Sequence, residues 1–421
     1  MKNSVIYHRS GNDMQTYLIA ALFCTITTCE FIKNIYAVYA VCLVGLLILT
    51  WRNRGDNSFF YLLFMLLPIF TSHNISQQLT PIFKFVTYII TGIIISRIQR
   101  LNKKFIYLIV LIGSIHVFAT LLFFVFRSAY FSYYYGYASS IFLNFPQGTN
   151  GGITGFTAGL NSHFSSNALY IIMELFAVIS LYYSCAKRDF KKYIYIIAIL
   201  ITSLALFLTT KRAHLLFGII SVIIILYVER IISNRNLLRI IIVGGCIFLI
   251  MIFLYIYIPE VFLVFDRFSE AGDQGRVNLI YRAWGFFEDS PITGIGWLQF
   301  SNLYSRYDYV SYNVHNVYVQ LLCETGVLGV LLFIGIIIRN LKITFNLLNN
   351  ENHFSAYNRA IIQYCGFVQV FFVLYCFTGN CIYDNTFFYY MVSSGILWSY
   401  SNKLNIRNEI KVVIKRLISL R

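Results

Sequence analysis

The chain is short of charge. Only 12% of its 421 residues are Asp, Glu, Lys or Arg, whereas 58% are hydrophobic, and a soluble domain carries roughly 25% charged residues. So little polar side chain could not cover an apolar core of this size in water. The composition therefore excludes a soluble globular protein and predicts an all-α protein that crosses a membrane many times.

Signatures of several enzyme classes are also missing. The sequence has no DxD pair to hold a metal and a nucleotide sugar, and no HExxH, Walker loop or GxSxG. Its nine cysteines form no CxxC pair. We expect free thiols, although Cys376 and Cys381 could approach each other near an outer turn. These absences argue against a zinc site, ATP-driven transport, metalloproteases and serine hydrolases, and we expect neither a metal nor a cofactor.

Apolar runs long enough to cross a bilayer recur along the whole chain. We predict twelve spans, at about 15–30, 35–51, 57–72, 82–98, 104–126, 165–186, 193–210, 213–231, 238–258, 316–338, 359–379 and 385–401. The chain then divides into nine spans at 1–258 with a loop at about 127–164, a large late loop at 259–315, three spans at 316–401 and a basic tail at 402–421.

The basic residues set the orientation. With the N-terminus inside and the spans alternating, most of the 33 Lys and Arg residues fall on the inner side, as the positive-inside rule requires. The formal net charge of +16 is therefore an orientation signal, and we expect no nucleic-acid partner. Both termini are predicted to be cytoplasmic, with the tail on the inner leaflet, and both long loops are predicted to lie outside.

The stretch from residue 276 predicts an amphipathic helix. Its apolar residues recur at steps of three and four, so one stripe can lie against the membrane: Val277, Ile280, Trp284 and Phe287. Arg276 stands at the N-terminal end, where free amides favour an anion. Arg282 lies about 240° further around the helix, so it is expected to pair with Glu288 or Asp289. Pro291, Gly294 and Gly296 then predict a tight turn.

Two other basic residues, Lys211 and Arg212, lie in the short outer turn between the seventh and eighth spans. Cations at a helix end can simply extend to the polar boundary. They can also clamp a phosphate, for which the planar fork of Arg is suited. Both interpretations stay open at this level.

His315 and Asn316 begin the tenth span. An imidazole titrates near neutral pH and can take a proton from a hydroxyl, although a histidine here can also be a helix cap. Glu324 lies inside the same span, where a carboxylate is costly without a partner, and Gly326 and Gly329 would let another helix approach. Inside other spans, His116 and Glu174 could form a buried hydrogen-bonded pair.

Two stretches together resemble a known signature. GRVNLIYRAW…DSPITGIGW followed by HNVYVQLLCETGVLG resembles the pattern of the O-antigen polymerase and O-antigen ligase superfamily. The earlier LTTKRAHLL resembles the second hallmark of that superfamily, a basic pair at the outer end of a span. The close matches cover about a fifth of the chain.

The resemblance implies a metal-independent, GT-C-like membrane glycosyltransferase. Its donor and acceptor would be undecaprenyl-diphosphate-linked glycans at the periplasmic face of the bacterial inner membrane, with membrane lipid and a chain-length regulator as further partners. The key arginines of the family match Arg212 and Arg276, and its key histidine matches His315. Lys211 and Arg282 are further candidates for binding the diphosphate, and the candidates for structural support are Glu324, Asn316, Gly294 and Gly296.

These assignments agree with the chemistry of glycosyl transfer. Breaking a sugar–diphosphate bond builds negative charge on the departing phosphate, which fixed guanidinium groups stabilise without a metal. His315 would deprotonate or orient the acceptor hydroxyl, with inversion at the sugar carbon. The aromatic residues of loop 127–164 would stack on sugar rings.

Three functions remain open. The leading one is a polymerase of O-antigen, capsular or exopolysaccharide repeat units, and the second is the ligase that moves the finished glycan to lipid A–core. The third is a flippase of lipid-linked glycans. A flippase should carry cations along a path inside the bundle, whereas the ionisable residues within these spans are mainly acids and His116.

Overall fold

The computed structural model describes residues 2–29, 35–53, 59–71, 75–98, 101–126, 159–161, 163–186, 189–231, 273–308, 312–350 and 354–419. Regular structure in these ranges is helical, with no strand. The helices are α1 (Lys2–Thr28), α2 (Ile35–Thr50), α3 (Phe59–Thr71), α4 (Ile75–Ser96), α5 (Lys104–Val125), α8 (Phe164–Ser184), α9 (Lys191–Leu208), α10 (Arg212–Val228), α13 (Asp273–Asp289), α14 (Gln299–Asp308), α15 (Val317–Asn349), α16 (Ala356–Tyr375) and α17 (Thr386–Ser419).

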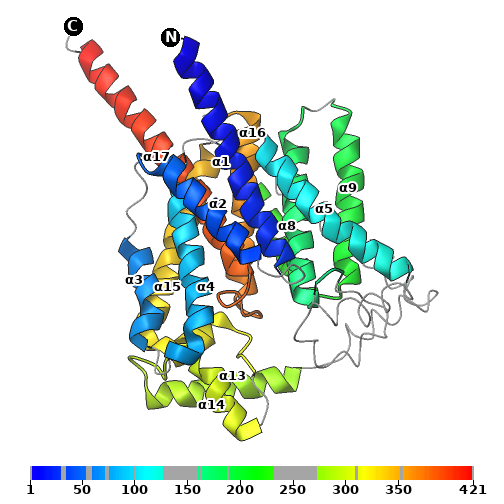
Figure 1. Ribbon diagram of the computed structural model, residues 1–421, viewed down its shortest axis with the longest axis vertical. Coiled ribbons are helices and arrows are strands. Elements are labelled where there is room, and N and C mark those ends of the chain that lie inside the picture. Colours follow the sequence, from blue (N-terminus) through cyan, green and yellow to red (C-terminus); the bar gives the residue numbers. More distant parts are fainter. Residues whose placement is uncertain are drawn as a thin grey trace.

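Most of the helices gather into one bundle (Figure 1). The start of α1 and the end of α17 project from the same end of this bundle, which we call the terminal end. Helices α13 and α14 lie crosswise at the opposite end, which we call the loop end. The chain termini and the described part of the second long loop therefore lie at opposite ends, as the predicted topology requires.

Among the described residues, five helices contain a stretch long and apolar enough to cross a membrane, namely Gln78–Ser96 of α4 and the helices α5, α8, α9 and α15. Helices α2 and α10 are shorter and also apolar. Every predicted span within the described residues coincides with a helix, whereas the span at 238–258 and nearly all of loop 127–164 lie outside them. The chain is a helical membrane protein with several spans, and the total of twelve stays a prediction.

Burial separates central from peripheral helices. In the span-length stretch of α8, 83% of the residues are buried, and most residues of α16 are buried as well. Peripheral helices instead expose large apolar side chains, including Val41 at 71%, Phe83 at 70% and Phe118 at 65%. Exposed apolar surface on this scale is unfavourable in water and favourable in lipid, so these outer faces are the lipid-facing surface of the bundle.

Asn340 of α15 joins three helices inside the bundle. Its Nδ2 lies 2.6 Å from the Tyr61 hydroxyl, 2.7 Å from the Tyr390 hydroxyl and 3.0 Å from Ser394 Oγ. Trp398 Nε1 donates to Asn340 Oδ1 at 3.0 Å. Because lipid offers no hydrogen bonds, polar groups at this depth must find partners within the protein. This network therefore fixes α3 and α17 against α15.

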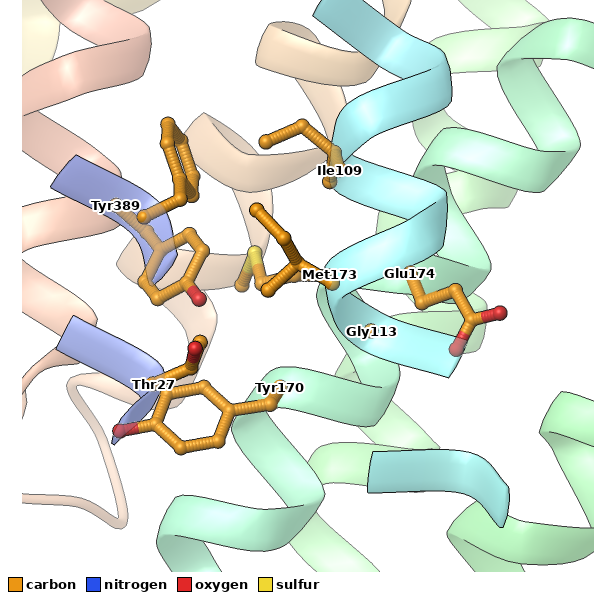
Figure 2. Close-up of a pocket in the computed structure, with 9 residues that line it drawn as sticks. Thr27, Ile109, Gly113, Tyr170, Met173, Glu174 and Tyr389 are labelled. Carbon is orange, nitrogen blue, oxygen red and sulfur yellow. The ribbon is translucent and has the colours of Figure 1, made fainter. Parts of the chain in front are cut away.

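The structure does not pair His116 with Glu174. Glu174 Oε1 accepts a hydrogen bond from Ser114 Oγ at 2.9 Å, its Oε2 has no partner among the described residues, and His116 Nδ1 lies 3.2 Å from Asn161 Nδ2. Figure 2 shows the pocket that Glu174 borders, with the carboxylate pointing away from Tyr389. The pocket holds about 10 Å³, roughly the space of one water. The hypothesis of a direct pair was wrong because each side chain finds a nearer partner.

The described cysteines are free thiols, which confirms that prediction: Cys24, Cys29, Cys42, Cys185, Cys323, Cys365, Cys376 and Cys381. The side chains of Cys376 and Cys381 are hydrogen-bonded to each other in the connection between α16 and α17. We call this connection, residues 376–385, the α16–α17 loop.

Candidate active site

The loop end of α15 contains a break that receives the predicted tight turn. Gly326 has φ 67° and ψ −169°, so the helical path is interrupted there. The turn fills the interruption with backbone hydrogen bonds: Ile295 N donates to Cys323 O at 2.9 Å, Gly296 N to Glu324 O at 2.9 Å and Val327 N to Pro291 O at 3.0 Å. The two halves of the signature motif therefore dock onto each other through backbone groups.

Glycine is required on both sides of this docking. Gly294 has φ 69°, and a Cβ there would lie 2.3 Å from the carbonyl carbon of Glu324. A Cβ on Gly326 would lie 2.1 Å from the carbonyl oxygen of Ile292. The segment that approaches Gly326 is thus the turn, not the helix that the sequence suggested. At Gly329 a helix does approach, since a Cβ there would lie 3.2 Å from the Leu67 side chain of α3.

The Glu324 side chain ties this junction to two other segments. It is fully buried. Its Oε2 accepts from Leu298 N at 3.0 Å and from the Tyr383 hydroxyl at 2.6 Å, and its Oε1 accepts from Gln320 Nε2 at 3.1 Å. A buried carboxylate is tolerated because these donors replace its hydration. Glu324 therefore joins the turn, α15 and the α16–α17 loop through hydrogen bonds.

Replacing Glu324 by Gln should lower the free energy of unfolding by about 1–3 kcal/mol. The NH₂ group of Gln would replace one carboxylate oxygen, and the hydrogen-bond donor that this oxygen now accepts from would face another donor. The check is the apparent melting temperature of the purified protein in detergent. Glu288→Gln is the matched control, since Glu288 is exposed on α13 and exposed substitutions stay within about 0.5 kcal/mol. Equal melting temperatures for the two variants would contradict the structural role.

Helix α13 packs on α15 through residues outside the stripe that was predicted to lie against the membrane. Leu279 and Ala283 are buried, whereas Val277 and Trp284 of the predicted stripe are each 47% exposed. Val277 and Trp284 are therefore accessible to lipid, and contact between this stripe and the membrane stays a prediction. Arg276, in the first turn, is exposed.

His315 lies in a strained turn directly before α15. Its φ is 56°, a left-handed value that few residues other than Gly, Asn, Asp and His adopt. Two side chains fix this turn. Asn316 caps α15 by accepting from Val319 N at 3.2 Å, and Gln320 accepts from Val314 N at 3.3 Å. The Asn316 cap confirms a helix start at this place and leaves the imidazole of His315 available for another role.

Two cations at the starts of other helices act on the pKa of His315. Burial lowers the pKa of the half-buried imidazole, and the charges of Arg276 and Lys211 lower it further. Arg276 also lies within electrostatic range of Tyr375, the last residue of α16. Arg276 at the start of α13 and Lys211 just before α10 thus lie within electrostatic range of His315, and together with burial they favour its neutral form.

The other predicted cations lie close by in the sequence. Arg212 is the exposed first residue of α10, next to Lys211, whose Nζ lies 6.0 Å from the centre of the Phe164 ring. Arg282 is exposed on α13. Glu288, one of the two partners expected for Arg282, accepts a hydrogen bond from Trp284 Nε1 at 2.8 Å. The structure brings together Lys211, Arg276 and His315. Binding of the diphosphate stays a prediction for all four of these cations, Lys211, Arg212, Arg276 and Arg282.

Several residues around this region were missed by the sequence reasoning. Asn380 Nδ2 lies 3.3 Å from His315 Nδ1, and Tyr375 is hydrogen-bonded to the side chain of Ser165. Asp384 Oδ1 accepts from Thr386 N at 2.7 Å. Burial raises the pKa of this carboxyl, while the hydrogen bonds from Thr386 and the charge of Lys84 partly offset the rise. These are common polar residues without a motif, so only the fold reveals them.

Within the described residues, no group of three or more His, Cys, Asp or Glu side chains is placed to hold a metal ion. Around His315, the charged side chains that the structure places within electrostatic range are Arg276 and Lys211. Fold and site together define a helical membrane protein with a cationic, histidine-bearing site at one end of its bundle.

Comparison with known families agrees with this class. Residues 197–334 match the sequence profile of a family described as O-antigen ligase, and the matched stretch contains Lys211, Arg212, Arg276 and His315. The match confirms the resemblance to the O-antigen polymerase and ligase superfamily over this part of the chain. No curated protein sequence matches the chain.

Proposed function

We propose that this protein polymerises undecaprenyl-diphosphate-linked repeat units into O-antigen, capsular or exopolysaccharide. The observation that carries the proposal is the convergence of Arg276 and Lys211 on a neutral His315 at the loop end of a membrane bundle. The match to a family of glycosyltransferase-like membrane enzymes supports it. In this proposal the loop end faces the periplasm, the bundle crosses the inner membrane twelve times, and a chain-length regulator is a partner.

The cations would act on the leaving group. When the bond between the sugar and the diphosphate breaks, the electron pair leaves with the phosphate oxygen, and negative charge grows there. Arg276 at the start of α13 and Arg212 at the start of α10 would stabilise this charge together with Lys211. Removing one such donor typically costs about 10²–10³-fold in turnover, so each arginine is expected to matter.

His315 would act on the acceptor. A neutral imidazole can take the proton of the attacking sugar hydroxyl while the oxygen bonds to the anomeric carbon from the face opposite the diphosphate. Burial and the neighbouring cations favour this role in the free enzyme, because both lower the pKa of His315 and so favour the neutral form that a base requires.

Ligation to lipid A–core is the second candidate, and the description of the matched family favours it. Purified protein given only lipid-linked repeat units would produce a ladder of longer lipid-linked glycans if it is a polymerase. A ligase would produce no ladder and would transfer glycan only when lipid A–core is added. A flippase would do neither and would move the lipid-linked unit across a vesicle membrane.

Replacing Arg276 by Lys should lower the transfer rate about 10²-fold, because Lys loses the planar fork that holds two phosphate oxygens. The measurement is the initial rate of ladder formation by the purified protein, with and without EDTA. Arg52→Lys is the control, since Arg52 is exposed just after α2. A rate for Arg276→Lys equal to that of the control would contradict the role of Arg276 in binding the phosphate. Loss of wild-type activity in EDTA would indicate a metal.

A further inference from the structure

The imidazole of His315 is held from one side by the α16–α17 loop. Asn380 Nδ2 lies 3.3 Å from Nδ1 of His315, although the two residues are 65 positions apart in the sequence. Asn380 lies beyond residues 197–334, the stretch that matches the family profile. With Nδ1 engaged by Asn380, Nε2 is the ring nitrogen that can meet a substrate.

The loop that carries Asn380 is anchored to the same helix as His315. Val317 N, in the first turn of α15, donates to Cys376 O at 2.8 Å. Tyr383 N donates to Asn380 O at 2.9 Å, and the Tyr383 hydroxyl donates to Glu324 Oε2 at 2.6 Å. Asn380 and His315 therefore share one rigid frame, which is what a positioning contact requires.

The amide of Asn380 has two orientations that give His315 opposite chemistry. If Nδ2 faces the ring, Nδ1 of His315 is the acceptor, and the proton of the neutral imidazole sits on Nε2. If the amide turns by 180°, Oδ1 accepts from Nδ1–H, and Nε2 carries the lone pair. Nitrogen and oxygen of an amide occupy equivalent positions, so the hydrogen-bond network decides between them.

Packing alone does not select an orientation. The amide atom turned away from the ring, placed as Oδ1, is buried without a partner among the described residues, and exchange would leave Nδ2 there instead. The protonation state that the His315 ring needs for catalysis therefore determines the orientation of the Asn380 amide. A base for the acceptor hydroxyl needs its lone pair on Nε2, and the imidazolium formed by proton transfer needs an acceptor at Nδ1–H.

We propose that Asn380 is a positioning residue that accepts Nδ1–H of His315 through its carbonyl oxygen and so directs the lone pair of Nε2 to the acceptor hydroxyl. This inference rests on the proposed function. In the step, Nε2 takes the hydroxyl proton, the sugar oxygen bonds to the anomeric carbon, and the electron pair of the broken bond leaves with the diphosphate. Asn380 stabilises the resulting imidazolium without adding a charge to the site.

Two substitutions separate the two orientations. Asn380→Asp keeps an oxygen acceptor and removes the donor, whereas Asn380→Leu removes both at similar size. In the full-length protein reconstituted with lipid-linked repeat units, Asn380→Leu should lower kcat about 10²-fold with little change in KM. Asn380→Asp should keep transfer, with the acidic limb of its pH profile moved upward, because a carboxylate beside Nδ1–H raises the pKa of His315.

Asn302→Asp is the matched control, because Asn302 is exposed on α14 at the same end of the bundle. It should leave the rate and the pH profile unchanged. Loss of activity in Asn380→Asp as complete as in Asn380→Leu would mean that the amide donates, and would overturn the proposal. A wild-type kcat and pH profile for Asn380→Leu would overturn it as well.

A readout independent of activity covers the case in which a variant does not fold. Nitrogen-15 spectra of histidine-labelled protein in lipid bilayers identify which ring nitrogen lacks a proton, and His315→Asn assigns the signals. The unprotonated nitrogen should be Nε2 of His315, and an unprotonated Nδ1 would overturn the proposal. Failure of the proposed function would look different, since wild-type protein would then make no glycan ladder whatever the spectra show.

Discussion

Replacing His315 by Asn lowers the turnover number of glycan transfer about 10²–10⁴-fold, the usual contribution of a general base, and leaves donor affinity nearly unchanged. Asn is the informative replacement because residue 315 has φ 56°, a left-handed conformation that Asn also adopts readily. The turn before α15 is thus preserved while the titrating group is lost. Turnover and donor affinity are measured separately, by ladder formation and by binding of the lipid-linked glycan.

The pH dependence of the wild type gives a second test of the same residue. Because burial, Arg276 and Lys211 lower the pKa of His315, kcat/KM should rise with pH through a pKa below the ordinary histidine range and then level off. A bound diphosphate would offset the two cations and raise this pKa, so the acidic limb of kcat should lie at higher pH than that of kcat/KM. Unchanged turnover in His315→Asn, or the same acidic limb in that variant, would remove His315 as the base.

Replacing Gly326 by Ala should prevent stable folding. The residue has φ 67° and ψ −169°, in a region of backbone conformation that is essentially restricted to glycine. A Cβ would also lie 2.1 Å from the carbonyl oxygen of Ile292 and 2.8 Å from that of Pro291. Because both obstacles are backbone atoms, side-chain rotation cannot relieve them, and the cost should exceed about 3 kcal/mol.

Gly335→Ala provides the control on the same helix. A Cβ on Gly335 meets nothing within 4 Å, and Ala is preferred over Gly inside a helix by about 1 kcal/mol. The amount of folded protein recovered from membranes and its melting temperature in detergent are the measurements. Gly326→Ala should lose folded protein, while Gly335→Ala should keep it. Equal recovery of both variants would show that the turn does not dock at Gly326 as described.

These two expectations divide the signature motif by role. Gly294, Gly326 and Glu324 hold the turn, α15 and the α16–α17 loop together through backbone and carboxylate hydrogen bonds. His315 and Arg276 face the region where cations gather. A glycine variant should therefore fail by losing folded protein, whereas a His315 variant should fold and lose turnover.

The amino-acid sequence by itself determined the helices and the chemical identity of the main groups. Apolar runs specify helices wherever backbone groups must be paired within lipid, so the described spans were predictable from local composition. Lys211 and His315 were recognisable because they adjoin predicted span ends, and Arg276 because it begins a predicted amphipathic helix; the resemblance to the superfamily drew attention to Arg276 and His315 as well. The tight turn at Gly294 and Gly296 was also a local signal.

Only the tertiary structure decided which distant residues meet. Nothing in the sequence around Asn380 indicates a contact with His315, and His116 and Glu174 took partners other than each other. The stripe by which α13 packs on α15, which includes Leu279 and Ala283, was likewise not indicated by the sequence, because it depends on the surface that the rest of the bundle presents to the helix. Helix formation depends on neighbours along the chain, whereas these contacts depend on how packed helices and loops satisfy buried polar groups across the bundle.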